Sequence, residues 1–425
     1  MSTPRISEQT LGNGLKVVAI DLPGFHSVTN FLCIRSGSRY EDQTNNGVAH
    51  FLEHMVFKGT EKFPDTLSVA QSIEGIGGHF NAWTSNDHTA YWNTVPHDEW
   101  QRGIEVPFEL AFRPLMRTTD LERERGVIVE EIRRMRDEPA SYVDDILGSV
   151  LFPDSSLGLS VIGTEERIKK MTLEQFQDYR AKYYHSAQSV FVVAGNLHGK
   201  DIFAEVERLT KTLQSKPVTK PSFVSSPSSK AVKLHTKKTD QTHFMLAVTD
   251  PTLGLHGPEQ YVATILNAVL GQGMSSRLFL NIRERQGLAY AIRSYFSPFE
   301  DTGVIQIYGG VNTEKVSATL TALEHELSRL QNEPVGADEL SKAIRMVTGS
   351  YDLTADSPSE LARWYGSTRL MGLDDNLEQS KKELEAVSAE QIQELAKKVL
   401  GKERQVIAVI GPYDDDAQFR KFLNL

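Results

Sequence analysis

The stretch MTLEQFQ at residues 171–177 returns as VSAEQIQ at residues 387–393, 216 positions later in the chain. Each copy predicts the start of a helix. Thr172 and Ser388 are suitable N-cap residues, and a glutamine follows three positions after each of them, as in a capping box. A repeat with this spacing predicts that the chain contains two copies of one domain.

Two further echoes occur in the same order along the chain. The apolar run SVFVVAG, which ends at Gly195, returns as QVIAVIG, which ends at Gly411, again 216 residues later. The stretch GHFNAW at 78–83 is echoed by GLAYAI at 287–292, with a spacing of 209. Short apolar runs that end in glycine are typical of buried strands. We therefore expect two homologous domains of about 200 residues, each mixing strands with longer amphipathic helices.

A linker separates the two copies. The segment SKPVTKPSFVSSPSSK at 215–230 is rich in Pro, Ser and Lys and has no hydrophobic period, which is typical of a linker. The sequence thus predicts an N-terminal domain over 1–214 and a C-terminal domain over 231–425. The length of 425 residues also favours two domains over one.

The composition argues against several classes of protein. The chain is 40% hydrophobic and 24% charged, which is typical of a soluble globular protein, and none of its apolar runs is long enough for a membrane span. A net charge of −10 without a basic, aromatic-laced patch argues against a nucleic-acid partner. Cys33 is the single cysteine, so an internal disulfide and a thiolate zinc site are excluded. The N-terminal stretch has no export signal, and we expect a cytoplasmic protein.

The stretch HFLEH at 50–54 places three ionisable side chains in an otherwise apolar run. On a helix, His50 and His54 lie one turn apart on the same face, so their imidazoles can share one tetrahedral zinc. Glu53 would stand beside the metal as a proton acceptor, as in the HExxH motif read in the opposite chain direction. The alternatives are a helix with two solvated histidines and a structural zinc site, which would have no use for Glu53.

A catalytic zinc needs a third protein ligand. The stretch TDLERERGVIVEEIRRMRDE at 119–138 predicts a helix, with Val127 and Ile128 among its apolar positions. Glu124 and Glu131 are two helical turns apart and therefore point the same way. Packed against HFLEH, this helix could offer Glu131 as the third ligand and Glu124 as a group that holds a histidine ring. The alternative is an exposed helix face with salt bridges to the neighbouring arginines.

HFLEH, separated by 76 residues from Glu131, resembles the inverted-motif zinc peptidases, the family of pitrilysin, insulin-degrading enzyme and mitochondrial processing peptidase. The resemblance covers both halves of the chain. It is carried by FKGT (57–60), IGGHFNAWTSNDHTAYW (76–92), ERERGVIVEEI (122–132) and RLFLNIRERQGLAY (277–290). The length is similar to that of the bacterial, processing-peptidase-like branch.

The resemblance implies roles for particular residues. One Zn²⁺ per chain would be held by His50, His54 and Glu131, with Glu53 as the general base and Glu124 supporting the ligand shell. A second set would contact peptide substrates, and this set consists of Asn81 and Ala82 on an edge strand and of Arg283 and Tyr290 at the scissile carbonyl. The second half of the chain has no counterpart of HFLEH, so we expect a single metal site in the first half.

The resemblance also implies an architecture. Each domain would be α+β, with a mostly antiparallel sheet packed with helices, and one chain would form half of a clamshell chamber. A homodimer would then complete each active site with the partner's C-terminal domain. The alternatives within the family are a catalytically silent chamber or scaffold subunit and one subunit of a heterodimeric protease. Because this chain has every element of the zinc motif and also the arginine–tyrosine pair, we favour an active zinc metalloendopeptidase.

Overall fold

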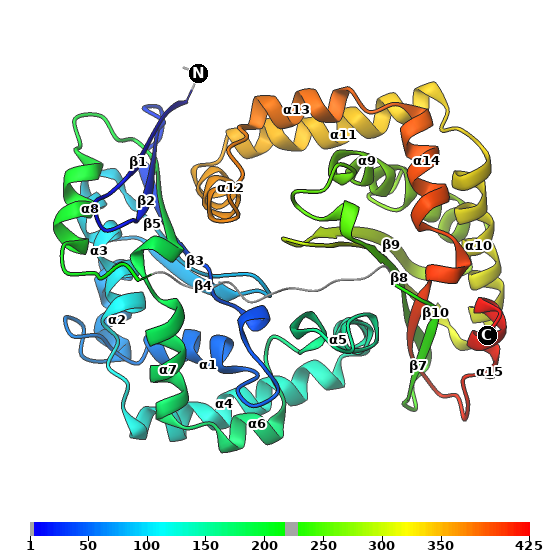
Figure 1. Ribbon diagram of the computed structural model, residues 1–425, viewed down its shortest axis with the longest axis horizontal. Coiled ribbons are helices and arrows are strands. Elements are labelled where there is room, and N and C mark those ends of the chain that lie inside the picture. Colours follow the sequence, from blue (N-terminus) through cyan, green and yellow to red (C-terminus); the bar gives the residue numbers. More distant parts are fainter. Residues whose placement is uncertain (1–3, 217–227) are drawn as a thin grey trace. The chain divides into compact units, whose positions relative to one another are not determined.

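The computed structural model describes residues 4–216 and 228–425 and divides into two compact units (Figure 1). Unit 1 combines residues 4–132, 159–216 and 353–376, and unit 2 combines residues 133–158, 228–352 and 377–425. Residues 217–227 of the predicted linker lie outside the described part of the chain.

A six-stranded sheet forms the centre of unit 1. Its strands lie in the order β1-β2-β6-β3-β5-β4, and β2 and β6 are parallel whereas the other neighbours are antiparallel. Among the described residues β4 pairs only with β5, so β4 is an edge strand. The strands are β1 (Arg5–Thr10), β2 (Lys16–Asp21), β3 (Ser27–Ile34), β4 (His79–Thr84), β5 (Thr89–Pro96) and β6 (Ser189–Gly195).

Helices cover both faces of this sheet. Asn30 and Phe31 are neighbours on β3 and therefore point to opposite faces. Asn30 lies against Gly103 of one helix, α3, and Phe31 lies against Gly366 of another, α12. The helices of unit 1 are α1 (Val48–Val56), α2 (Thr66–Glu74), α3 (Trp100–Phe112), α4 (Thr118–Asp137, of which the last turn belongs to unit 2), α6 (Glu165–Lys170), α7 (Leu173–Tyr183), α8 (Ile202–Thr210) and α12 (Pro358–Leu370).

Unit 2 is built around a five-stranded sheet in the order β7-β11-β8-β10-β9. Its strands are β7 (Ala231–Thr236), β8 (Gln241–Asp250), β9 (Ala289–Pro298), β10 (Gly303–Asn312) and β11 (Val406–Gly411). Its helices are α5 (Pro139–Leu151), α9 (Gln260–Leu270), α10 (Val316–Asn332), α11 (Ala337–Ala355, whose end belongs to unit 1), α13 (Leu377–Glu385), α14 (Ala389–Val399) and α15 (Ala417–Leu423). A π-helical segment, Phe279–Arg285, precedes β9.

The two sheets repeat one topology, as the sequence echoes predict. The order β2-β6-β3-β5-β4 in unit 1 matches β7-β11-β8-β10-β9 in unit 2, and β1 is the one strand without a counterpart among the described residues. The parallel pair β2–β6 corresponds to the parallel pair β7–β11. Helices α7 and α14 both begin with the predicted capping box. The prediction of an α+β fold with two homologous domains is therefore confirmed.

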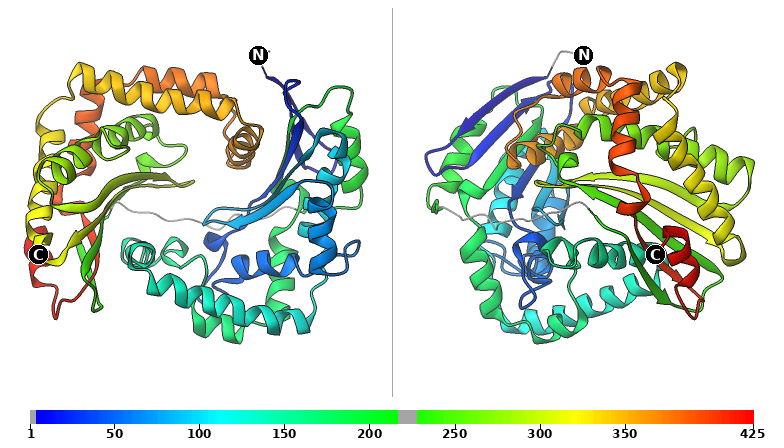
Figure 2. Two further views of the ribbon diagram at one scale, coloured as in Figure 1. Left: turned by 180° about the vertical axis from the view of Figure 1, so that it is seen from behind. Right: turned by 45° about the vertical axis from the view of Figure 1, so that its right-hand side comes forward.

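The compact units differ from a simple division of the chain at the linker, because each takes one helix from the other half of the sequence. Helix α12 packs on β3 and β6 of unit 1, and α5 packs on β8 and β11 of unit 2, as Figure 2 shows from two sides. Helix α5 contributes Val143 and Leu147 to a core that also contains Met245 and Ala247. The predicted boundaries 1–214 and 231–425 account for the two sheets but not for these exchanged helices.

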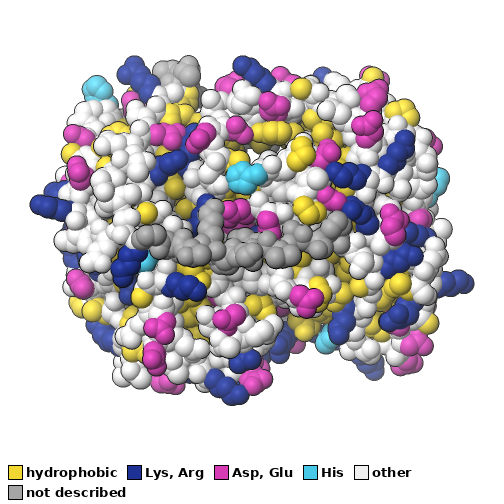
Figure 3. Space-filling view, viewed as in Figure 1, with side chains coloured by type: hydrophobic (Ala, Val, Ile, Leu, Met, Phe, Trp, Pro, Cys, Tyr) yellow, Lys and Arg dark blue, Asp and Glu magenta, His cyan; other side chains and the backbone are white. Residues whose placement is uncertain are grey.

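The described surface carries charges of both signs. On the face drawn in Figure 3, acidic and basic side chains are interspersed, and no broad basic area is formed by the described residues on that face. Within residues 4–216 and 228–425, no helix has both the length and the apolar character needed to cross a membrane.

Candidate metal centre

Helix α1 carries the HFLEH stretch and is anchored by its apolar face. Phe51 and Leu52 are fully buried, and the Phe51 ring packs edge-on against Phe176 of α7 at a centroid distance of 5.0 Å. Burial of two such side chains stabilises the packed helix by about 3–6 kcal/mol. Because these residues fix the rotation of α1, His50 and His54 are left on a partly exposed face, with ring centroids 4.8 Å apart.

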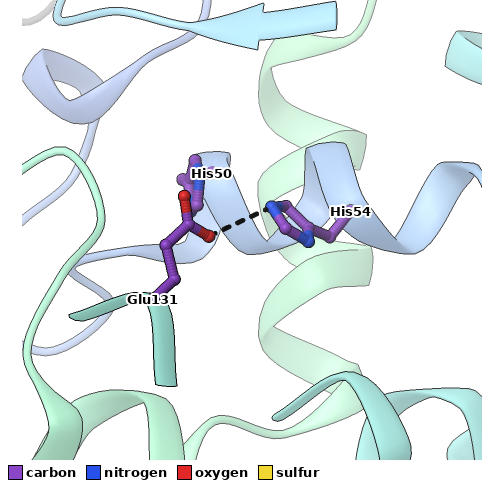
Figure 4. A group of neighbouring side chains, drawn as sticks. All are labelled: His50, His54 and Glu131. Carbon is purple, nitrogen blue, oxygen red and sulfur yellow. Dashed lines mark ion pairs between the residues drawn. The ribbon is translucent and has the colours of Figure 1, made fainter. Parts of the chain in front are cut away.

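Glu131 completes a three-residue group with the two histidines. Their candidate ligand atoms all lie within 4.8 Å of one another. Glu131 comes from α4, and its carboxylate points toward both imidazoles of α1, with Glu131 Oε2 at 3.6 Å from His54 Nε2 (Figure 4). The structure thus brings together the three residues that the sequence singles out as metal ligands.

Glu124, one predicted supporting residue, holds the other side of His54. Its Oε1 lies 2.9 Å from His54 Nδ1, and its Oε2 lies 2.6 Å from Lys58 Nζ. Burial alone would raise the pKa of Glu124, but the hydrogen bonds from His54 and Lys58 outweigh burial and lower it. An ionised carboxylate can only accept, so Nδ1 of His54 donates to Glu124, and Nε2 is the nitrogen that faces Glu131.

His50 is held in the neutral form. Burial, with a smaller contribution from the neighbouring His54, lowers the pKa of His50 to about 3. Its Nδ1 is buried and has no hydrogen-bond partner among the described residues.

These side chains fit zinc. Two neutral imidazoles and one carboxylate form a ligand set of catalytic zinc sites. A carboxylate behind a ligating histidine, as Glu124 stands behind His54, is the usual support of such a ligand. No described residue satisfies the buried nitrogen of His50, which leaves that ring free of competing hydrogen bonds.

Glu53 lies beside this group and is oriented by the sheet. Thr84, the last residue of β4, donates a hydrogen bond of 2.6 Å from its hydroxyl to Glu53 Oε2. Burial raises the pKa of Glu53, and the bond from Thr84 opposes the rise. The carboxylate is therefore positioned through one oxygen and is a better proton acceptor near neutral pH than an exposed glutamate.

The predicted substrate residues Asn81 and Ala82 lie in the middle of the edge strand β4. Phe80 packs against Phe57 at 5.7 Å, and Thr84 reaches Glu53 of α1. Because side chains alternate along a strand, Ala82 faces the same side as Phe80 and Thr84, and Asn81 faces the opposite side. No described strand pairs with the outer side of β4, although the backbone N–H of Ala82 donates to Asn81 Oδ1 at 2.8 Å.

Arg283 and Tyr290 belong to unit 2. Arg283 lies within the π-helical segment Phe279–Arg285, with its guanidinium 4.7 Å from the centre of the Phe279 ring. Tyr290 lies on the edge strand β9, and its side chain is 76% exposed. Both side chains are thus presented at the surface of their unit, and their part in the metal site remains a prediction.

Sequence reasoning missed Thr84 and Lys58. Lys58 follows His54 by four residues, a spacing that places both on one side of a helix turn and could have indicated the shared contact with Glu124. Thr84 lies two residues beyond Ala82, on the same side of β4, but its bond to Glu53 depends on how the strand packs on α1, for which the sequence has no signal.

Comparisons with known protein families give two matches. A model of the insulinase family, peptidase family M16, matches residues 16–165, and a model described as the peptidase M16 inactive domain matches residues 170–347. YmxG of Bacillus subtilis, described as an uncharacterized zinc protease, is 32% identical over 409 residues, which cover 96% of this chain and 98% of that protein. An uncharacterized zinc protease of Mycobacterium leprae is 31% identical over 414 residues, which cover 96% and 92%.

Solved structures share the fold. A protease from Helicobacter pylori superposes with a TM-score of 0.91 at 20% identity, and the match covers 96% of this chain and all of that chain. A Pseudomonas fluorescens structure described as a peptidase M16 inactive domain gives a TM-score of 0.88 at 21% identity, with 96% and 98% covered.

Proposed function

This chain belongs to the insulinase family of peptidases, peptidase family M16, and on that premise we propose that it is a zinc metalloendopeptidase that cleaves peptides or unfolded segments. The observation that supports the proposal most directly is the grouping of His50, His54 and Glu131 with the half-buried Glu53 beside them. A structural zinc site would not require a proton acceptor at that position.

The residues of this chain would have different roles in peptide hydrolysis. His50, His54 and Glu131 would hold a zinc ion, which would supply the Lewis acid that acidifies water and polarises the scissile carbonyl. Oε2 of Glu53 accepts the hydrogen bond from Thr84. Oε1 would therefore take the proton of the attacking water and later deliver it to the leaving amine. Glu124 keeps the His54 ring in the tautomer that leaves Nε2 free.

The substrate would lie along β4. An edge strand pairs with a peptide through backbone groups, so Asn81 and Ala82 would hold peptides of many sequences in an extended form. Arg283 and Tyr290 would stabilise the oxyanion of the tetrahedral intermediate. We assign these two residues to the partner chain of a homodimer, whose four domains would enclose a chamber, and we expect the assembly in the cytoplasm.

Replacing the base and the ligands separately tests the function. Glu53→Gln should retain about one zinc per chain but lose peptide hydrolysis by roughly a hundred- to ten-thousand-fold, since positioned proton transfer contributes about that much. His50→Ala and Glu131→Ala should lose the metal as well. Zinc content is measured by elemental analysis, and turnover is measured on a pool of unstructured peptides.

Glu130→Gln is the matched control, because Glu130 is the exposed neighbour of Glu131 on α4 and should keep both metal and activity when replaced. Wild-type protein that binds no zinc after reconstitution would refute the proposal. Wild-type protein that binds zinc but hydrolyses no peptide would support a silent subunit instead.

A further inference from the structure

Helix α1 has no side-chain cap of its own. Its N-cap residue, Gly47, has a left-handed backbone with φ 93° and offers no side chain to the free N–H groups of the first turn. A Cβ atom at Gly47 would lie 3.0 Å from Gly163 Cα and from Ile162 O, so a capping serine or aspartate does not fit there. The cap of this helix must therefore come from elsewhere in the chain.

Glu41 supplies that cap from a distance. Its Oε1 accepts from the backbone N–H of Ala49 at 2.8 Å, and its Oε2 accepts from the backbone N–H of Gly47 at 2.8 Å. The side chain of Asn46 donates a third bond to Oε2 at 2.9 Å. Glu41 is 6% exposed, so these bonds are shielded from water. One carboxylate thus fixes the first turn of the helix that carries His50.

The segment 37–41, which ends at Glu41, is also bonded to the turn after β4. Three backbone and side-chain bonds join Ser38 and Arg39 to Ser85 and Asn86. The Arg39 guanidinium, which is fully buried, also forms an ion pair of 3.3 Å with Asp87. This turn directly follows Thr84, whose hydroxyl orients Glu53.

The segment Gly37–Glu41 therefore connects two elements that must be in register for catalysis. One end holds the start of α1, which presents the metal ligands and Glu53, and the other end holds the turn of β4, which orients Glu53. A shift of either element by about 1 Å would separate Glu53 from its partner, and misplacement of that size is costly in active sites.

A buried carboxylate such as Glu41 is a costly cap for a helix. Burial raises the pKa of Glu41 to about 7, although the N–H groups of Ala49 and Gly47 act in the opposite direction. Burial of the ionised carboxylate therefore costs folding free energy at neutral pH. The three bonds that the carboxylate accepts from Asn46, Gly47 and Ala49 offset this cost, and all three lie at the start of α1, which points to a role in the placement of that helix.

We propose that Glu41 is a positioning residue of the metal site, whose carboxylate aligns α1 with the turn of β4. This inference rests on the proposed metallopeptidase function. If this is so, a substitution of Glu41 should change metal binding more than a substitution elsewhere in unit 1 that lowers the stability by the same amount.

The test compares Glu41→Gln with Glu109→Gln in the full-length chain. Glu109 is also buried in unit 1, at 5% exposed, but its carboxylate is paired with Arg113 and touches no residue of the metal group. Both variants should lower the thermal unfolding temperature. Only Glu41→Gln should release zinc to a chelator at least tenfold faster and alter the visible absorption spectrum of the cobalt-loaded protein, because supporting residues typically change metal affinity by about ten- to a hundredfold.

If Glu41→Gln does not fold, Glu41→Asp takes its place in the test. It keeps the charge but shortens the reach, and the same two changes in metal binding are expected. Unchanged zinc release and an unchanged cobalt spectrum would overturn the proposal. So would a failure of both Glu41 variants to fold beside a folded Glu109→Gln, because Glu41 would then serve the fold and not the site. A wild type that binds neither ion would instead refute the metallopeptidase function itself.

Discussion

The hydroxyl of Thr84 is a contact that opposes the effect of burial on the pKa of Glu53. Its hydrogen bond lowers the pKa of Glu53 against the effect of burial, so its loss in Thr84→Val should raise that pKa. Glu53 would then stay protonated to higher pH, and the acidic limb of the kcat profile should move to higher pH, as expected for the loss of a bond to a charged acceptor. The profile is measured with peptide substrates between pH 5 and 9.

Thr94→Val on the neighbouring strand β5 is the control for this change, because the Thr94 hydroxyl bonds to Thr29 and not to a residue of the site. It should leave the pH profile unchanged. An unshifted acidic limb in Thr84→Val, with normal zinc content, would show that Thr84 does not tune the base.

His88, in the turn after β4, makes the stability of unit 1 sensitive to acid. Burial lowers its pKa to about 4, whereas an unfolded histidine titrates near 6.5. Below pH 6.5 the unfolded state binds this proton more readily, so stability present at neutral pH is lost as the pH falls toward 4, by about 2 kcal/mol at pH 5. His88→Gln should lack this loss.

The four tryptophans, Trp83, Trp92, Trp100 and Trp364, all belong to unit 1, so their fluorescence reports the unfolding of that unit. Urea titrations of zinc-free wild type and His88→Gln at pH 7.5 and pH 5 measure the difference. If the free energy of unfolding falls equally in both proteins between pH 7.5 and pH 5, the loss is not caused by His88.

At the scale of single elements, Gly366 allows α12 to lie close to the sheet. A Cβ atom there would stand 2.5 Å from the ring of Phe31 on β3. Gly366→Ala should therefore destabilise unit 1 by about 1–3 kcal/mol, although alanine normally favours a helix. Gly126→Ala on α4 is the control, because a Cβ at Gly126 meets nothing within 4 Å, and it should stabilise the unit by up to about 1 kcal/mol. Tryptophan fluorescence during thermal unfolding measures both, and equal shifts would refute the packing argument.

Local signals explain which elements could be predicted from the sequence. The capping boxes at Thr172 and Ser388, the buried strands that end at Gly195 and Gly411, and the repeated topology all follow from short-range patterns. The exchange of α5 and α12 has no such signal, because it depends on the complementary shape of surfaces far apart in the sequence.

The candidate site shows the same limit. Helical spacing paired His50 with His54 and Glu124 with Glu131, and the resemblance to the zinc peptidases implied that Glu131 joins the histidines; the structure groups His50, His54 and Glu131. Periodicity alone misplaced Val127, which was expected at an apolar position of α4 but is 48% exposed. Thr84 was missed, because strand-to-helix contacts are set by packing and not by spacing along one element.

At the scale of the whole molecule, the proposed homodimer predicts complementation between two inactive chains. If zinc of one chain works with Tyr290 of its partner, a mixed dimer of Glu53→Gln and Tyr290→Phe has one site with both defects and one wild-type site. Co-refolded variants should recover up to about half of the wild-type activity per mixed dimer, provided that the sites act independently. Peptide hydrolysis is measured after subunit mixing has been shown with tagged chains.

The control for mixing is each variant co-refolded with itself, which should show no recovery. An unrescued mixture with proven mixed dimers would place the arginine–tyrosine pair in the same chain as the zinc it serves, or outside the site.

The exchange of α12 also determines when the first sheet can be fully covered during synthesis. A nascent chain that has left the ribosome as far as residue 214 has made every strand of the first sheet but not α12, so Phe31 and Val192 still lack the cover that Gly366 and its neighbours provide. At roughly 5–20 residues per second, that cover arrives about 8–30 seconds later. The half that carries the candidate metal site is made first and completed late, and in the interval an apolar face of its sheet would be open to chaperones.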